Sequence, residues 1–415
     1  MQFYALTGLV ASGLLSTSVS LASEPGQPGH YLFAWAGDQD QRGEDFIAVI
    51  DADPASPHYG ELLASAASGI VTRQVHHTEY WMPDSGQLFA NDHRSGDTVI
   101  FDLTQPLKPR VRARFHDLAG FSHPHSFVRL PNGHVLASFQ FEGAFHHGTG
   151  SQDAPAEDPA ARRGVHGGIV EIDDDGRAIR AASTADPGHA DNPLMAYSLV
   201  PLPDLDRVLV TNSGMRYEDP HARTYQIFRL SDLKLLSTNV FDPGPGRYGE
   251  INPEEPRRGP DGAVYVQTVG CGVERVSDLK SDRPVARLLY QFPGSFCGVP
   301  SVVGHYWIQS VQILHAVIAL DLTAEGGPRE VSRVVLDGQI LPHWTGYDAR
   351  TQRLAVSGYG EARVFVLSFD PQTGALVLDQ AFHDAAGRPG FDTGSRAWPH
   401  GWTGAAVVHG IVFSK

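Results

Sequence analysis

Short runs in which apolar residues follow or alternate with polar ones recur along the whole chain. Residues 45–51 (Asp-Phe-Ile-Ala-Val-Ile-Asp) and 316–321 (Ala-Val-Ile-Ala-Leu-Asp) are examples. Runs of this length, bounded by turn residues, are typical of β-strands. Almost no stretch has the apolar spacing of a long amphipathic helix, so the pattern predicts an all-β protein.

The runs are organised as a repeat. Seven segments share a polar or histidine start, a turn rich in Pro, Asp, Asn or Gly, and an apolar strand; they begin at His76, Pro124, Ala196, Glu250, Cys297, Pro342 and Pro399. Further apolar strands follow each segment, such as 99–102 and 109–115 after the first. This repeat predicts a seven-bladed β-propeller with four-stranded blades. The N- and C-terminal strands are expected to close one blade together.

Residues 1–22 are predicted to be a signal peptide. Their apolar run ends in Ser20-Leu21-Ala22, a small-x-small pattern that signal peptidase cleaves. The alternative interpretation is a buried N-terminal helix. Residues 23–415 then form a single propeller domain with a polar loop insertion at 142–166. We expect secretion into the periplasm, with no membrane insertion after cleavage because no later run is long enough to span a bilayer.

The charge and the cysteine content of the chain restrict what the protein can bind. The formal net charge is -15, and Lys and Arg are not clustered. Nucleic-acid binding is therefore excluded, because neutralising phosphates requires gathered basic side chains. A small-molecule substrate is the expected partner, and the oligomeric state stays open. The two cysteines, Cys271 and Cys297, are predicted to form a disulfide in an oxidising compartment, with a thiolate ligand as the alternative.

Histidines are the candidate ligands for a metal ion. Aligning the repeats places His77, His125, His343 and His400 at the start of the innermost strand in four consecutive blades, where they would face one central channel. Imidazole nitrogen suits copper, zinc or iron, and a metal would satisfy rings that are costly to bury unpaired. The alternative is a hydrogen-bonded or water-filled channel.

Four further residues belong to the predicted site. His76 and His123 are reserve ligands, since strand alternation would point them away from the channel if His77 and His125 point inward. Tyr197 and Glu250 stand at the corresponding place in the third and fourth blades. A carboxylate or phenol there is a candidate catalytic group that moves a proton.

Residues 45–81 and 98–115 show a motif pattern that continues more weakly through Pro124–Gly133, Glu250-Ile251, Val269–Cys271 and His400. In these stretches the chain resembles the selenium-binding protein family, whose bacterial members include copper-dependent methanethiol oxidases. The resemblance implies a channel metal, copper first and zinc, manganese or iron as alternatives, held at His76, His77, His125, Glu250 and His400. It also implies oxidation of sulfur compounds.

This chain departs from the family pattern. The cysteine pair after Trp81 is missing, Val128 and Glu255 stand where the family has histidines, and His343 stands where it has glutamine. The resemblance is thus that of a distant member with a redistributed ligand set. Three functions follow as hypotheses: a copper oxidase of small thiols that uses O2, a metal-dependent lyase or hydrolase, and a non-catalytic propeller that binds a metal or a partner.

Overall fold

The computed structural model describes residues 29–143, 164–214, 221–242, 251–281, 283–336, 338–359 and 362–415. The predicted signal peptide and most of the predicted insertion at 142–166 lie outside these residues. The described chain is almost entirely β-structure. It contains no α-helix in these ranges, and its only helical turns there are three short 3-10 segments. None of the described residues forms a helix long and apolar enough to cross a membrane.

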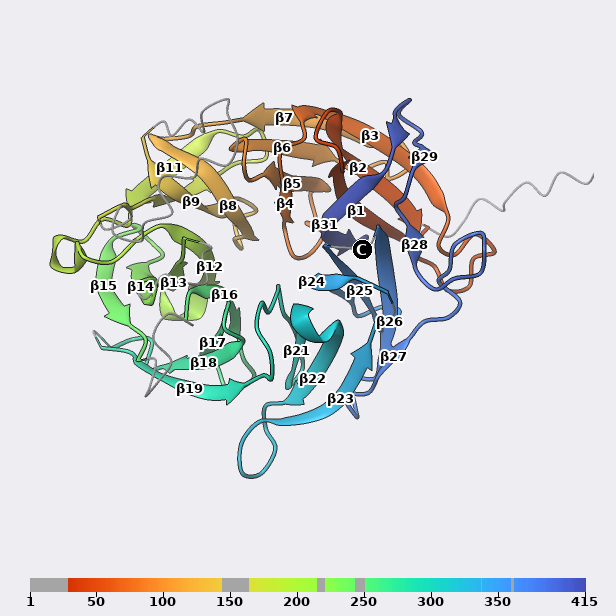
Figure 1. Ribbon diagram of the computed structural model, residues 1–415. Coiled ribbons are helices and arrows are strands. Elements are labelled where there is room, and N and C mark those ends of the chain that lie inside the picture. Colours follow the sequence, from red (N-terminus) through yellow and green to blue (C-terminus); the bar gives the residue numbers. More distant parts are fainter. Residues whose placement is uncertain are drawn as a thin grey trace, which may run out of the picture.

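Five sheets contain four antiparallel strands each, and they lie around a common centre (Figure 1). The first of these sheets consists of β4 (Val75–Thr78), β5 (Gln87–Asp92), β6 (Asp97–Asp102) and β7 (Arg110–Phe115), and the second of β8 (Phe121–Arg129), β9 (Val135–Glu142), β10 (Gly168–Ile172) and β11 (Ala178–Ser183). The third consists of β12 (Ala196–Leu202), β13 (Arg207–Asn212), β14 (Thr224–Arg229) and β15 (Leu235–Val240), and the fourth of β16 (Pro253–Arg258), β17 (Val264–Thr268), β18 (Gly272–Ser277) and β19 (Val285–Gln291). The fifth consists of β20 (Ser301–Val303), β21 (Tyr306–Val311), β22 (Ala316–Asp321) and β23 (Arg329–Val335).

The remaining large sheet has nine strands. It contains β24 (Leu341–Asp348), β25 (Arg353–Tyr359), β26 (Arg363–Phe369), β27 (Leu376–Leu378), β28 (Phe391–Asp392), β31 (Ala406–Phe413), β1 (Tyr31–Asp38), β2 (Glu44–Asp51) and β3 (Leu62–Val71). The first and last strands of the described chain, β1 and β31, pair along their length. A short separate hairpin joins β29 (Arg396–Ala397) to β30 (Thr403–Gly404).

The predicted count of seven blades is wrong. The propeller has five four-stranded blades, and the strands that were expected to form two more belong to the nine-stranded sheet. The two halves of that sheet are joined because Gly358 of β25 pairs with Val408 of β31 in addition to the pairing of β25 with β26. The all-β propeller class and the four-stranded blade are as the repeat predicted.

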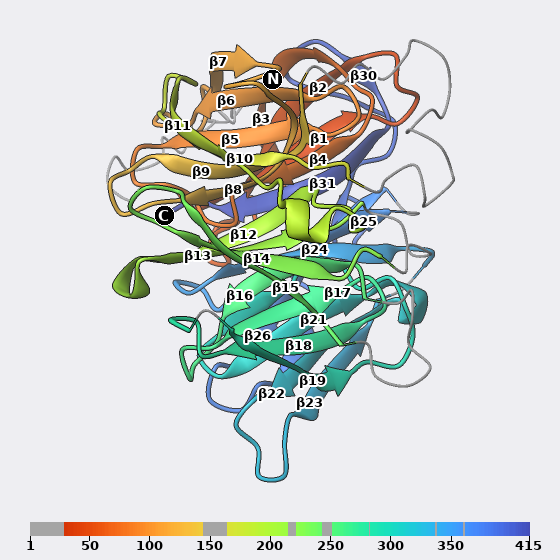
Figure 2. The same cartoon turned by 90° about the vertical axis from the view of Figure 1, so that its left-hand side faces the viewer.

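The strands become less buried with increasing distance from the centre of the propeller. The second strand β5 is buried throughout, whereas the outermost strand β7 alternates between exposed and half-buried residues. Apolar runs mark the inner strands because both of their faces pack against neighbouring sheets. Figure 2 shows the same ring of sheets from its edge, with β7 near the top of the view and β23 near the bottom.

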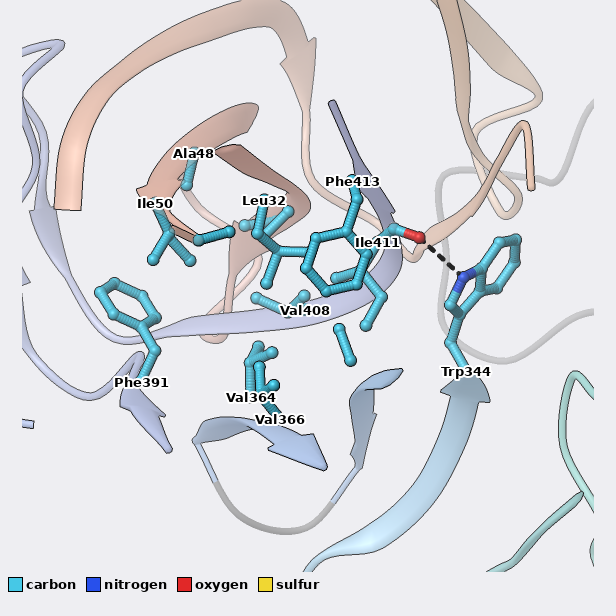
Figure 3. Packing of buried hydrophobic residues seen from close by; sticks show 14 of the residues in the cluster. Leu32, Ala48, Ile50, Trp344, Val364, Val366, Phe391, Val408, Ile411 and Phe413 are labelled. Carbon is cyan, nitrogen blue, oxygen red and sulfur yellow. Dashed lines mark hydrogen bonds between the residues drawn. The ribbon is translucent and has the colours of Figure 1, made fainter. Parts of the chain in front are cut away.

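A core cluster fills the nine-stranded sheet, where Leu32, Val408, Ile411 and Phe413 pack together (Figure 3). Trp344 on β24 belongs to the same cluster, and its indole Nε1 donates to the Ile411 carbonyl at 3.0 Å.

Candidate metal centre

Six innermost strands share one irregularity. In β4, β8, β12, β16, β24 and β31, the register against the neighbouring strand shifts so that one extra residue is inserted. The residues inside these bulges are His76 and His77, His125 and Ser126, Tyr197, Glu254 and Glu255, His343, and His409 and Gly410. Since a β-bulge breaks the alternation of a strand, it can aim side chains that a regular strand would send elsewhere.

The bulge in β4 explains why strand alternation failed as a guide to His76. His76 and His77 were expected on opposite sides of the strand, but their rings stack with centroids 4.5 Å apart. Both side chains are buried, and both face His125 with centroid separations of 4.6 and 4.4 Å. His76 therefore lies inside the cluster and not in reserve.

His76, His77 and His125 form the centre of the histidine cluster. One nitrogen from each ring lies within 4.8 Å of the others. The Nε2 atoms of His76 and His125 are 2.8 Å apart. Three imidazoles at this separation are within reach of a single transition-metal ion, for which metal–nitrogen distances are about 2.0–2.1 Å.

His400 lies outside the cluster. Its Nδ1 contacts Ser65 Oγ on the outermost strand β3 at 2.7 Å, and its ring packs on Phe46 and Trp402. The repeat alignment failed here because Pro399-His400 resembles the other strand starts, whereas the innermost strand begins later, at Ala406.

His409 on β31 is the histidine that the sequence analysis missed. Its ring lies 4.5 Å from both His76 and His343, and 5.8 Å from His77. Aligning the apolar strand 406–413 itself, and not the Pro-His dipeptide before it, would have placed His409 at the channel. His343 reaches the cluster from β24, as the alignment predicted.

His93 also joins the group, and His123 lies beyond it. The His93 ring is 5.0 Å from His76 and 5.3 Å from His125, and its Nε2 contacts Gln140 Oε1 at 2.7 Å. His123 packs against His93, with ring centroids 6.2 Å apart, and against Phe141. Of the two reserve ligands, only His76 therefore belongs to the compact trio.

The cluster is electrostatically suited to neutral imidazoles. Burial, followed by the neighbouring histidines, holds the pKa values of His76, His77, His125 and His409 well below the usual range. Burial alone lowers the pKa of His343 to about 4. Neutral rings carry the lone pairs that bind metals.

Several of these nitrogens lack a hydrogen bond. Among the described residues, His76 Nδ1, His77 Nε2 and His343 Nε2 are buried with no hydrogen-bond partner. Leaving such groups unpaired is costly, at about 1–3 kcal/mol each, unless another group satisfies them. The donor set therefore fits a bound transition metal.

Acidic and phenolic side chains lie beside the histidine cluster. The predicted catalytic residue Glu250 lies outside the described residues. Tyr197 lies 3.9 Å from the His125 ring, measured between centroids, and burial together with Glu254 and Glu255 raises the pKa of its hydroxyl. Burial also raises the pKa of Glu254 to about 8. Both groups consequently keep their protons at neutral pH.

Polar side chains on the second strands brace the innermost segments. Each donates from one strand to a backbone carbonyl of the next innermost segment around the centre of the propeller: Asn91 to Pro124, Ser138 to Tyr197, Thr211 to Glu254, Gln267 to Cys297, Ser310 to His343, and Ser357 to His409. Five of the six accepting carbonyls belong to bulged residues or their immediate neighbour. These hydrogen bonds thus hold in place the innermost strands that carry the site residues.

The two cysteines form the predicted disulfide, Cys271–Cys297, with Cα atoms 5.0 Å apart. It links the turn before β18 to the segment that precedes β20. Because these are the chain's two cysteines, no thiol remains to ligate a metal or selenium.

No family model and no curated protein matches the sequence. Solved structures match the fold. A hypothetical selenium-binding protein from Sulfolobus tokodaii superposes with a TM-score of 0.68 at 13% identity, covering 94% of each chain.

Two lactonase-like structures are also similar. A putative 6-phosphogluconolactonase from Bacteroides fragilis has a TM-score of 0.62 at 9% identity, over 95% of this chain and 100% of that one. The periplasmic gluconolactonase of Pseudomonas aeruginosa has a TM-score of 0.59 at 14% identity, over 93% and 99%. At these identities the likeness shows the propeller fold alone, so the resemblance to selenium-binding proteins stands only as a distant propeller relationship.

Proposed function

We propose that this protein is a metal-binding propeller that holds one transition-metal ion, copper or zinc, at His76, His77 and His125, with His343 and His409 beside them. The observation that carries the proposal is the convergence of buried imidazoles whose nitrogens have no hydrogen-bond partner among the described residues. Imidazole is a good ligand for both ions.

Its place of action is proposed to be the periplasm. The Cys271–Cys297 disulfide supports an oxidising compartment. The likeness to a periplasmic gluconolactonase agrees with this location.

A catalytic role for the centre is supported by the groups beside it. Tyr197 contacts the His125 ring, and Tyr197 and Glu254 hold protons at neutral pH. They would donate a proton to a small molecule bound at the metal. Copper would supply redox chemistry, as in the oxidation of small thiols with O2, whereas zinc would supply Lewis acidity for a lyase or hydrolase reaction.

The test is metal content after expression with export to the periplasm. Wild-type protein should retain about one metal ion per chain, since the trio can share a single ion. His76→Ala and His125→Ala should each lose most of it. His400→Ala is the matched control, because it removes a histidine that contacts Ser65 and not the cluster.

Elemental analysis of the same samples identifies the metal. Copper together with thiol-dependent O2 consumption would support the oxidase, and zinc without O2 consumption would support the lyase or hydrolase. A protein that binds metal but catalyses neither the oxidation nor the lyase or hydrolase reaction would be a non-catalytic metal-binding propeller. Equal retention of metal by the cluster variants and the His400 control would contradict the metal centre.

A further inference from the structure

Ser126 lies beside two of the three central histidines. It is fully buried in the bulge of β8, and its Oγ lies 3.2 Å from His77 Nδ1 and 3.4 Å from His125 Nδ1. The contact with His77 lies within the usual hydrogen-bond range of about 2.7–3.2 Å, whereas the contact with His125 is longer and weaker. One hydroxyl thus approaches the same nitrogen, Nδ1, on two neighbouring rings.

Ser126 is also close to a phenol that binds a carboxylate. Tyr80 Oη lies 3.3 Å from Ser126 Oγ and donates to Glu255 Oε2 at 2.6 Å. The same carboxylate oxygen accepts from the buried Arg257 at 3.0 Å. A phenol has one proton, and the shorter contact of Tyr80 is with the carboxylate, so its oxygen is left to accept from Ser126.

These partners decide the direction of the hydrogen bonds at Ser126. A hydroxyl has one proton to donate and two lone pairs with which to accept. When the proton is donated to Tyr80, both lone pairs remain for the Nδ1–H groups of His77 and His125. Even if the proton were donated to one ring, the other ring would have to donate from Nδ1 to keep its contact.

The two nitrogens of His77 lead to the same assignment. Nδ1 has Ser126 as a partner, whereas Nε2 is buried with no hydrogen-bond partner among the described residues. Glu255 Oε1 lies 3.7 Å from Nε2, which is too long for a hydrogen bond. A proton on Nε2 would therefore be buried without an acceptor, whereas Ser126 accepts a proton on Nδ1. We accordingly expect the Nδ1–H form of His77, with the lone pair on Nε2.

We propose that Ser126 is a positioning residue of the metal centre: by accepting from His77 Nδ1–H, it fixes the tautomer whose Nε2 lone pair binds the ion. The inference rests on the proposed function. A histidine that binds a metal usually donates its other ring N–H to a protein group, which sets the tautomer and the orientation of the ring. Here the acceptor is a serine hydroxyl that Tyr80 connects to a carboxylate.

Ser198 is the matched control for Ser126, because it holds the corresponding place in the next blade. Ser126 N–H donates to Ser138 Oγ on β9 at 3.1 Å. Ser198 N–H donates in the same way to Thr211 Oγ1 on β13 at 3.2 Å. Ser198 is also fully buried, and its hydroxyl donates to Glu255 Oε2 at 3.1 Å. No hydrogen bond joins its side chain to a histidine of the described chain.

The first measurement is the tautomer of His77 in metal-free protein. Exported, disulfide-bonded protein labelled with nitrogen-15 in histidine is freed of metal with a chelator and studied by long-range proton–nitrogen correlation. The His77 signals are those missing from His77→Gln. Wild type and Ser198→Ala should show His77 in the Nδ1–H form alone. Ser126→Ala should lose this single form, because no hydroxyl then accepts from Nδ1.

The second measurement is the affinity for Zn²⁺, obtained by competition with a chromophoric chelator. Ser126→Ala should weaken binding by about 10–100-fold, the loss typical of an outer-shell partner, and Ser198→Ala should keep wild-type affinity. Ser126→Thr, which keeps the hydroxyl, should restore both the tautomer and the affinity. Near-ultraviolet circular dichroism checks the fold, and Ser126→Gly, which removes the same hydroxyl, takes the place of Ser126→Ala if that variant does not fold.

The outcomes separate the inference from the proposed function. An Nε2–H form of His77 in wild type would overturn the inference alone. The inference is also wrong if only one of the two quantities, tautomer or affinity, changes in Ser126→Ala, because a residue that merely supports the fold would not move both together. If His76→Ala and His125→Ala keep wild-type Zn²⁺ affinity, the metal centre is itself wrong and the inference falls with it.

Discussion

Asn91 at the end of β5 connects two of the histidine-bearing strands. Its Oδ1 accepts from the His77 backbone N–H at 2.7 Å, and its Nδ2 donates to the Pro124 carbonyl, next to His125, at 2.5 Å. The side chain is fully buried. Asn91→Ala would leave one donor and one acceptor of the backbone unpaired in the interior.

The expected cost follows from those two groups. Each buried backbone group left without a partner costs about 1–3 kcal/mol, so Asn91→Ala should lower the free energy of unfolding by about 2–6 kcal/mol. The measurement is equilibrium urea unfolding of metal-free protein, followed by tryptophan fluorescence. Metal affinity should fall as well, because the bulges that carry His77 and His125 lose their shared support.

Gln105→Ala is the control for this experiment. Gln105 is exposed in the turn after β6, and its substitution should cost less than about 1 kcal/mol. A loss below about 1 kcal/mol for Asn91→Ala, equal to that of the control, would show that the buried contacts do not stabilise the innermost strands as argued.

Two further predictions concern stability away from the histidines. Burial would raise the pKa of Asp348, but hydrogen bonds from His30 and Thr351 outweigh it and lower this pKa to about 2. The carboxylate therefore stabilises the fold above its unfolded pKa of about 3.9, and this contribution is lost as pH falls towards 2. Asp348→Asn should lower the unfolding midpoint at pH 6, with a difference from wild type that shrinks between about pH 4 and 2; a difference independent of pH would contradict this. Replacing Cys271 and Cys297 together by Ala should cost on the order of 3 kcal/mol in urea unfolding, and an unchanged midpoint would show that the disulfide does not stabilise the fold.

The sequence alone determined the strand content and the repeat. Short apolar runs predict strands because the inner strands are buried on both faces, and this burial needs no knowledge of which strands pair. The disulfide was also foreseen from two cysteines in a chain expected to be exported. His77, His125 and His343 were expected on innermost strands and lie on β4, β8 and β24, although His125 lies in the middle of its strand and not at its start. Each belongs to a recurring segment that the alignment could use.

The tertiary structure decided the number of blades and the membership of the histidine cluster. The Gly358–Val408 pairing that joins two sets of strands is a contact between distant segments, and no local pattern encodes it. His76 was assigned to the wrong side because β4 is bulged. His409 was missed because the alignment took Pro399-His400 as a strand start, whereas β31 begins at Ala406. A bulge is defined by hydrogen bonds to the neighbouring strand, so the period-two pattern of a single strand cannot show where a side chain will point.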